Sequence, residues 1–319
     1  MSTRKINLDV DNSLNSLTTT YAGEFAGDYI AAALLSGATI SNGGITVKPN
    51  IKYKEVIKKV ASSGIVADAT CDFSLTADAL TLTERILQPE EFQVNLQLCK
   101  KDYRNDWEAI AMGISAYDNM PPKFSDFLIS HVAAKVAEKT EETIWGGANG
   151  NAGEFDGFVT LFGSDSDVVD VTAGTVTAAN VISELGKVVD AIPSKIYGKE
   201  DLFIYIPQNV AKAYVRALGG FGASGLGANG VNAQGTQWWN NGALSFDGVN
   251  LFVAPGLASN KMVCAQKSNL YFGTGLLSDH AEVRLIDTSE TLGDQNVRII
   301  MRFTSGVQYG IGSEVVLYS

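Results

Sequence analysis

Residues 121–158 read PPKFSDFLISHVAAKVAEKTEETIWGGANGNAGEFDGF, and this stretch decides the fold. Apolar residues recur every three or four positions from Pro122 to Trp145, which predicts one amphipathic helix of roughly 36 Å. Prolines suit its first turn, and Trp-Gly-Gly ends it before a small-residue turn and the segment Gly153–Phe158. The expected core positions of this helix are Phe124, Phe127, Leu128, Val132, Val136 and Ile144.

The composition favours a protein that buries its surface against neighbours. The chain has 319 residues, enough for one large or two smaller domains, and 45 % are hydrophobic. Only 18 % are charged, against about 25 % in a typical soluble domain. The net charge of −11 disfavours a nucleic-acid-binding protein, because affinity for phosphate comes from Lys and Arg. Ordinary solubility explains the acidic balance equally well.

The cysteines and the N-terminus indicate the compartment. Cys71, Cys99 and Cys264 lie far apart and form no C-x-x-C spacing, which fits free thiols in a reducing compartment. The first residues contain no apolar signal-peptide region. No run of about 18 apolar residues occurs, so we expect no membrane span. The expected location is the cytoplasm.

Residues 80–98 alternate between apolar and polar side chains on both sides of the break Gln88-Pro89-Glu90-Glu91. Two amphipathic strands around such a break predict a β-hairpin. A two-stranded hairpin is marginally stable alone in water, so a neighbouring subunit is a plausible support. Its candidate contact residues are Leu82, Ile86, Phe92, Val94 and Leu96.

The segment Lys52–Val60 holds the only basic cluster of the sequence. Its four lysines accompany Val56, Ile57 and Val60, and this pattern favours a solvated helix face over a nucleic-acid-binding patch.

The rest of the chain divides into a polar arm, a mixed region and a β-rich end. Residues 1–20 read as an extended arm, followed by a short helix at 23–36. The mixed region and the β-rich end contain the expected strands 168–176, 202–206, 249–253, 262–265, 270–272, 282–287 and 296–304, the expected helices 178–192 and 208–218, and a glycine-rich stretch at 219–235.

Motifs that could carry chemistry are few. Gly225–Gly230 matches G-x-G-x-x-G, but a dinucleotide site needs this motif after a strand and before a helix. Here it follows a helix and precedes a segment without helical period, which favours a surface loop. Ser-His-Asp or Cys-His catalysis would need His131 or His280, and neither has a nucleophile-elbow context. We read His131 as a packed core imidazole.

Metal and glycosidase sites have equally weak support. His and Cys residues lack ligand spacing for a metal. The acidic groups Asp102, Asp106, Glu108 and Asp165, Asp167, Asp170 could hold a hard cation, but solvated loops are the default. A pairing of Glu84 with Glu90 or Glu91 cannot be judged without geometry. We therefore expect no catalytic residue, no cofactor and no metal.

The ordered set of elements resembles the HK97-fold major capsid protein of tailed double-stranded DNA bacteriophages along nearly the whole chain. The features that carry the resemblance are the long helix 122–145, the strand–helix unit Leu202–Leu218 and the Asp247-Gly248 turn that feeds a strand and Pro255. Each motif alone is degenerate, and their order is more specific than any one of them.

The resemblance implies an α+β fold with named regions. They are an N-arm and short helix (1–38), an E-loop region (39–100), a P-domain with the spine helix 122–145 (101–165), an A-domain (166–277), and P-domain strands with the C-terminus (278–319). The E-loop would contact an adjacent subunit through Leu82, Ile86, Phe92, Val94 and Leu96. The A-domain loop at the capsomer axis would contain Gly219, Gly225, Gly227 and Gly230.

The implied function is a shell protein. Hexamers and pentamers would build an icosahedral head around double-stranded DNA without sequence-specific binding, and an acidic inner wall would not grip its contents. Partners would be copies of the chain, a portal, a scaffold or protease, and decoration proteins. The virion would be assembled in the host bacterial cytoplasm. The alternatives are an encapsulin-type nanocompartment shell, and an α+β enzyme or nucleotide-binding protein supported by Gly225–Gly230.

Overall fold

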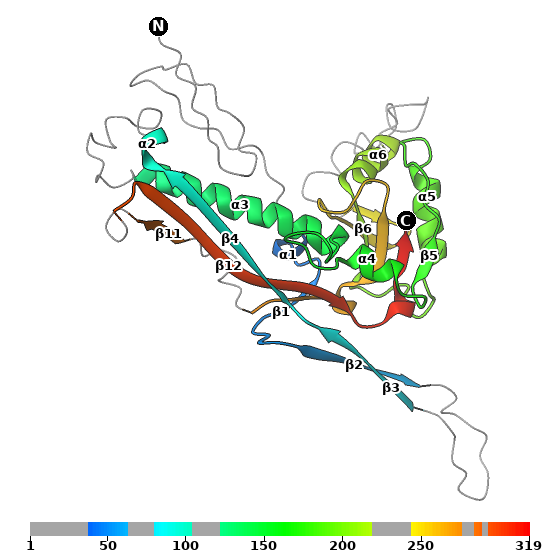
Figure 1. Cartoon of the computed structure of the whole chain (residues 1–319). Coiled ribbons are helices and arrows are strands. Elements are labelled where there is room, and N and C mark those ends of the chain that lie inside the picture. Colours follow the sequence, from blue (N-terminus) through cyan, green and yellow to red (C-terminus); the bar gives the residue numbers. More distant parts are fainter. Residues whose placement is uncertain (1–37, 63–79, 104–121, 219–243, 276–283, 289–292) are drawn as a thin grey trace, which may run out of the picture. The chain divides into compact units, whose positions relative to one another are not determined.

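The computed structural model describes residues 38–62, 80–103, 122–218, 244–275, 284–288 and 293–319 (Figure 1). The chain forms two compact units. Unit 1 comprises residues 1–34, 93–136 and 278–302, and unit 2 comprises 35–92, 137–277 and 303–319. Several predictions lie outside the described residues, namely the helix at 23–36, the arm, the glycine-rich stretch and His280.

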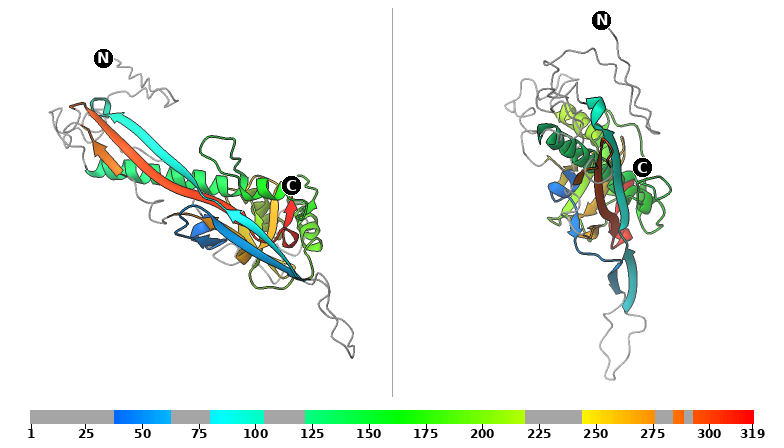
Figure 2. Two further views of the ribbon diagram at one scale, coloured as in Figure 1. Left: turned by 60° about the horizontal axis from the view of Figure 1, so that its bottom comes forward. Right: turned by 60° about the vertical axis from the view of Figure 1, so that its left-hand side comes forward.

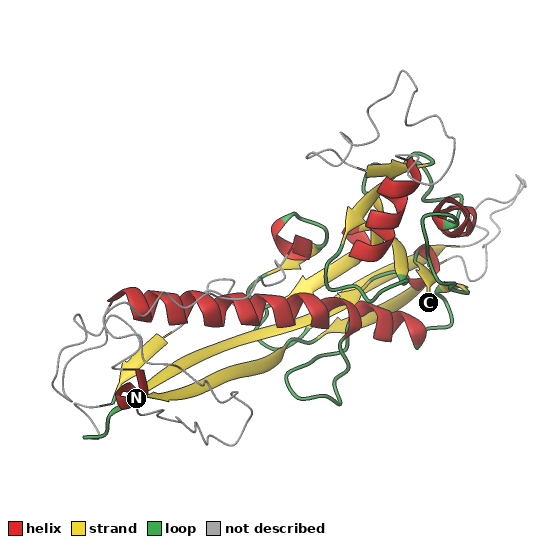
Figure 3. Ribbon diagram, turned by 90° about the horizontal axis from the view of Figure 1, so that it is seen from above, coloured by secondary structure: helices red, strands yellow, loops and turns green. Residues whose placement is uncertain are grey.

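The predicted long helix is confirmed as α3, Pro122–Gly146, which is the long red helix of Figure 3. Of its expected core positions, Val132, Val136 and Ile144 are buried and Leu128 is half-buried. The side chains of Phe124 and Phe127 lie outside the described part. No helix in the described ranges is long and apolar enough to cross a membrane.

A six-stranded mixed sheet organises most of unit 2, in the order β5-β13-β9-β6-β8-β7. Helices α5 (Val181–Asp190) and α6 (Gln208–Leu218) share its core, because Leu185, Val188 and Val210 pack with buried strand residues. The strands are β5 Val169–Val171, β6 Leu202–Ile206, β7 Leu244–Phe246, β8 Val249–Val253, β9 Met262–Gln266 and β13 Val316–Tyr318.

The β7–β8 connection is a tight hairpin turn. Asp247 and Gly248 both have positive φ, 44° and 77°. Two consecutive residues of positive φ are what a type I′ turn requires, and Asp-Gly is a preferred pair for it. The prediction of a turn at Asp247-Gly248 is therefore confirmed.

The second sheet is built on the long strand β12, Asn296–Tyr309. In unit 2, β1 pairs with β10, and β10 pairs with the last residues of β12. In unit 1, β11 pairs with the first residues of β12, and β4 also pairs with this strand. The partners of β12 in this sheet are β1 Thr46–Lys48, β4 Glu90–Cys99, β10 Leu270–Gly273 and β11 Arg284–Asp287.

Short helical segments complete the described chain. A second core of unit 2 packs around Trp145, Phe158 and Phe162, at the end of α3 and in α4. The segments are α1 Ala38–Ser41, α2 Lys100–Tyr103, α4 Phe158–Gly163, and the 3₁₀ turns Lys267–Asn269 and Gly312–Glu314.

Strands β2 (Glu55–Ser62) and β3 (Leu80–Leu87) form a separate antiparallel pair in unit 2, which we call the ribbon. The prediction of a helix at Lys52–Val60 is wrong, since most of this segment is β2. Apolar residues at 56, 57 and 60 fit either period in so short a run, and the β-branched side chains favour a strand.

The prediction that residues 80–98 form one hairpin is wrong in its pairing. Both strands exist, as β3 and β4, but β3 pairs with β2 and β4 pairs with β12. The break Gln88-Pro89 contains no glycine or asparagine that would favour the positive φ of a two-residue hairpin turn. The chain therefore does not reverse there but passes from the ribbon into another sheet.

Candidate assembly interface

One face of the ribbon carries three cross-strand pairs of exposed side chains. The register places Val56 opposite Ile86, Lys58 opposite Glu84, and Val60 opposite Leu82. Because side chains alternate along a strand, all six point to the same side. We call these six residues the ribbon face. Figure 2 shows the two strands of the ribbon running side by side.

The ribbon face is apolar at both ends and charged at its centre. The exposed fractions are 43 % for Val56, 46 % for Ile86, 62 % for Val60 and 73 % for Leu82. Full burial of a fully exposed aliphatic side chain stabilises by about 1.5–3 kcal/mol, so each of these partly buried side chains would contribute roughly half of that in a contact. A monomer rarely displays contiguous apolar pairs of this kind without a partner. The face is therefore suited to protein–protein contact.

The opposite face of the ribbon is fixed to unit 2 near its base. Ile57 and Leu87 are buried and pack with Ile51 and the half-buried Tyr271 as a small separate core. Gln308 also donates a hydrogen bond from Nε2 to the carbonyl of Ile86, at 3.1 Å. The ribbon thus presents one exposed face while its base stays anchored.

The structure separates the contact residues that were predicted together. Leu82 and Ile86 belong to the ribbon face, whereas Phe92, Val94 and Leu96 belong to β4. Phe92 is half-buried, with its ring centroid 6.1 Å from that of Phe155 and 5.7 Å from that of Phe303. Leu96 is 43 % exposed and Val94 is half-buried.

Sequence reasoning missed Val56 and Val60 as members of this face. The signal that could have found them was the alternation of Val56, Lys58 and Val60, which matches Leu82, Glu84 and Ile86 on the other strand. The predicted capsomer-axis glycines, Gly219, Gly225, Gly227 and Gly230, lie outside the described residues, as does the G-x-G-x-x-G motif.

A buried carboxyl ties the end of α3 to the α1 segment. Thr39 donates to Glu141 from its backbone N–H, at 3.1 Å, and from its hydroxyl. Trp145 Nε1 donates to the same hydroxyl at 2.9 Å, and the backbone N–H of Gly256 also reaches Glu141. Burial raises the pKa of Glu141, and these hydrogen bonds only partly offset it. This site fixes the chain immediately after residue 37.

Glu141 should make stability fall as pH rises. Its folded pKa lies above its usual value of 4.5, so between these two values the folded chain binds more protons than the unfolded chain. Stability contributed by this group is present at pH below 4.5 and is lost as pH passes through the raised pKa. Glu141→Gln should therefore flatten the pH dependence between pH 4.5 and neutrality, measured by urea unfolding.

The exposed neighbour Glu142→Gln is the control for losing one carboxylate from the same helix turn. If Glu141→Gln and the wild type change in parallel with pH, Glu141 does not titrate in this range and the assignment fails.

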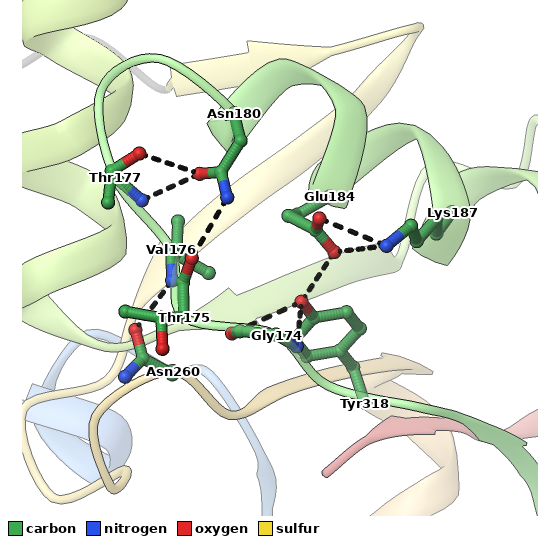
Figure 4. A network of polar contacts seen from close by, with 9 residues as sticks. All are labelled: Gly174, Thr175, Val176, Thr177, Asn180, Glu184, Lys187, Asn260 and Tyr318. Atoms are coloured by element: carbon green, nitrogen blue, oxygen red, sulfur yellow. Dashed lines mark hydrogen bonds and ion pairs between the residues drawn. The ribbon is translucent and has the colours of Figure 1, made fainter.

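A polar network ties the C-terminal strand to α5 (Figure 4). Tyr318 donates to Glu184 Oε2 at 2.6 Å and accepts from the Gly174 amide at 2.8 Å, while Lys187 pairs with Glu184 at 2.7 Å. Hydrogen bonds from Lys187 and Tyr318 lower the pKa of Glu184. Asn260 accepts from the Val176 amide beside it at 3.0 Å. These contacts hold β13 against α5 and the loop at Gly174.

In unit 1, a buried lysine joins α2 to β11. Lys100 is fully buried and pairs with Asp287. Its backbone N–H donates to the carbonyl of Gln295 at 2.9 Å. Removing one partner of a buried pair leaves an uncompensated charge, so this contact fixes how the end of β4 meets β11.

Several of the residues considered for chemistry can be placed in the fold. Across the residues that the structure describes, no group of three His, Cys, Asp or Glu could hold a metal ion. Burial raises the pKa of the Cys264 thiol to about 12, so it is not a thiolate at neutral pH. His131 lies half-buried within α3, and the acidic residues Asp165 and Asp167 take part in structural hydrogen bonds.

Comparison with known proteins identifies the fold. No family profile matches the chain, and no curated protein sequence is similar to it. Among solved structures, 181 chains are similar. The capsid of an empty GTA particle is 12 % identical with a TM-score of 0.60, covering 91 % of this chain and 98 % of the other.

Two further structures come from named phages. The capsid of Myoviridae phage XM1 is 11 % identical with a TM-score of 0.58, covering 91 % of this chain and 94 % of the other. A structure from Mycobacterium phage Che8 is 11 % identical with a TM-score of 0.54, and the match covers 97 % of this chain and 98 % of the other. The chain therefore has the α+β, HK97-like fold of phage capsid proteins, and the fold prediction is confirmed.

Proposed function

We propose that this chain is the major capsid protein of a tailed double-stranded DNA bacteriophage, and that its copies assemble as hexamers and pentamers into the icosahedral head shell. The likeness to capsid structures over nearly the whole chain supports this proposal. The observation that carries it is the ribbon face, because four exposed aliphatic side chains on a two-stranded ribbon need a partner.

Shell assembly gives these features a physical role. One ribbon contact of modest strength is repeated on every copy, and heterologous contacts that repeat by rotation close into rings. Each copy in a shell has several such contacts at once, and their multivalency makes the assembly far more stable than one contact. Phe92, Val94 and Leu96 on β4 remain proposed contact residues beside Leu82 and Ile86.

We also propose what the shell encloses, which other proteins it binds and where it is located. The shell encloses double-stranded DNA without reading its sequence, in keeping with a net charge of −11. A portal, a scaffold or protease, and decoration proteins are the other proposed partners. The chain acts as a structural protein rather than an enzyme, and it resides in the virion after assembly in the host bacterial cytoplasm. The glycines from Gly219 to Gly230 are proposed to lie at the capsomer axis.

Sedimentation velocity of the purified chain, alone and co-expressed with its neighbouring genes, tests this proposal. We expect a discrete species in the megadalton range, at a concentration-dependent yield. Nucleic acid inside such particles supports a phage head, and an enzyme cargo supports a nanocompartment instead. A small oligomer under every condition, including co-expression, would count against a shell protein.

A further inference from the structure

The base of strand β3 is held by one charged side chain. Arg85 pairs with the carboxylate of Asp165, and its guanidinium lies over the ring of Tyr309, 4.1 Å from the ring centroid. Tyr309 in turn donates to the same Asp165 oxygen at 2.6 Å. We call these three residues the Arg85 anchor. They come from the ribbon, the loop after α4 and the end of β12, all within unit 2.

The two partners of Arg85 form a rigid platform. Tyr309 is 1 % exposed and meets the ring of Phe162 edge-on at 4.8 Å. Asp165 also accepts from the Asp167 amide at 3.0 Å. A Cβ at Gly312 would lie 2.6 Å from the Asp165 carboxylate, so the backbone closes over it. Arg85 therefore docks on groups that cannot easily move.

Other described contacts also hold the base of the ribbon, among them the hydrogen bond from Gln308 to the carbonyl of Ile86. The apolar base of the ribbon consists of Ile57 and Leu87 packed on Ile51 and Tyr271. At the other edge Lys48 pairs with Glu55 and lies 5.0 Å from the Tyr271 ring centroid. These contacts lie at the base of the ribbon, so a directional contact there favours one orientation of the two strands.

We propose that Arg85 is a positioning residue that fixes the direction in which the ribbon leaves unit 2, and thereby the geometry in which the ribbon face meets a second copy of the chain. This inference rests on the proposed function for its second half only. The first half concerns the isolated chain and can be tested without assembly.

The chemistry of the contact favours arginine. A planar guanidinium can stack flat on Tyr309 while its N–H groups reach the carboxylate in the guanidinium plane, whereas a lysine ammonium has no plane to stack and no fork of donors. Arg85 and Asp165 side chains are 30 % and 17 % exposed, so water screens the pair only in part. Burial opposes ionisation of Asp165, but hydrogen bonds from Tyr309, the Asp167 amide and Arg85 outweigh it and lower its pKa. The carboxylate is thus charged at neutral pH.

The test compares Arg85→Met with Lys52→Met, because both remove one positive charge and Lys52 is exposed just before the ribbon. Hydrogen exchange of the ribbon amides, 55–62 and 80–87, reports on the base directly. We expect exchange roughly tenfold faster in Arg85→Met, the factor that follows from losing a charged hydrogen bond, and no change in Lys52→Met. Arg85→Lys should fall between them, and Tyr309→Phe, which keeps the ring, should have a smaller effect than Arg85→Met.

Particle geometry is the second readout, because a merely stabilising contact would change yield but not shape. We expect Arg85→Met to give particles of mixed size or open sheets where the wild type and Lys52→Met give uniform particles.

Equal rates of hydrogen exchange in Arg85→Met and Lys52→Met would overturn the inference. Faster exchange with unchanged, uniform particles would overturn its second half. If the wild type forms no particles, the proposed function fails, while the exchange result still decides the role of Arg85. Should Arg85→Met not fold, Arg85→Lys and Tyr309→Phe give the same comparison.

Discussion

Replacing Val60 and Leu82 together by aspartate should abolish shell formation and leave the subunit folded. Both side chains are mainly exposed in the single chain, at 62 % and 73 %, so folding does not depend on their burial. In an assembled contact the new carboxylates would lose their water, which costs several kcal/mol for an unpaired charge. The measurement is sedimentation velocity for assembly. In urea unfolding we expect a loss of about 1–2 kcal/mol with the subunit still folded, because the two carboxylates lie opposite each other and aspartate disfavours a strand.

A matched control separates this effect from a general response to surface charge. Ile182 is 51 % exposed in the same unit and belongs to α5 rather than to a ribbon strand, so Ile182→Asp, compared with Leu82→Asp alone, makes a one-charge change on another element. We expect Ile182→Asp to leave folding unchanged and to reduce assembly far less. Normal shells from the Val60→Asp, Leu82→Asp variant would remove the ribbon face from the account.

The second large effect is expected where α3 ends. Gly147→Ala should destabilise the chain by about 3 kcal/mol, at the upper end of what overpacking costs. A Cβ at Gly147 would lie 2.3 Å from the carbonyl oxygen of Phe155 and 2.8 Å from that of Thr143. These are backbone atoms, so no side chain can move aside. Urea unfolding measures the loss.

The adjacent glycine supplies the control. A Cβ at Gly146 would meet nothing within 4 Å, so Gly146→Ala should leave stability unchanged or raise it by up to about 1 kcal/mol, as expected for alanine replacing glycine in a helix. Gly157→Ala should behave like Gly147→Ala, since its Cβ would lie 2.4 Å from the carbonyl oxygen of Thr143. Equal stability of Gly146→Ala and Gly147→Ala would show that the backbone at this junction shifts to accommodate the added Cβ.

Local patterns predicted the elements that depend on local physics. In the second half of α3 the buried residues Val132, Val136, Thr140 and Ile144 recur every four positions, and β6 with α6 combines a continuous apolar run with a following amphipathic segment. The Asp247-Gly248 turn was predictable because its backbone conformation needs those residues. Such signals do not depend on what the element packs against.

Strand partners depend on distant residues, and the predicted pairing of residues 80–87 with residues 90–98 was wrong. Leu82 and Ile86 were placed on one face because alternation within a strand is local, but β3 pairs with β2 rather than with β4. The aromatic neighbours of Phe92, Phe155 and Phe303, lie far from it in the sequence, and no local pattern predicted them. The Glu141 site joins Thr39 and Glu141, which lie 102 positions apart, and no local sequence pattern indicates this contact.

The Arg85 anchor shows the same limit. Arg85 lies on the polar side of an amphipathic strand, where a solvated charge is the ordinary expectation. Its importance arises because Asp165, 80 residues away, and Tyr309 meet it at one point. Residues of this kind are recognised only after the fold brings them together.

The most direct test of the account is a cryo-electron microscopy reconstruction of the particles that the wild-type chain forms. We expect a closed shell in which the ribbon of each copy lies on an adjacent copy, with Val56, Val60, Leu82 and Ile86 buried at that contact. A shell whose ribbons stay exposed to solvent would contradict the role assigned to the ribbon face. Failure to form any ordered particle, with or without the products of neighbouring genes, would contradict the proposed function.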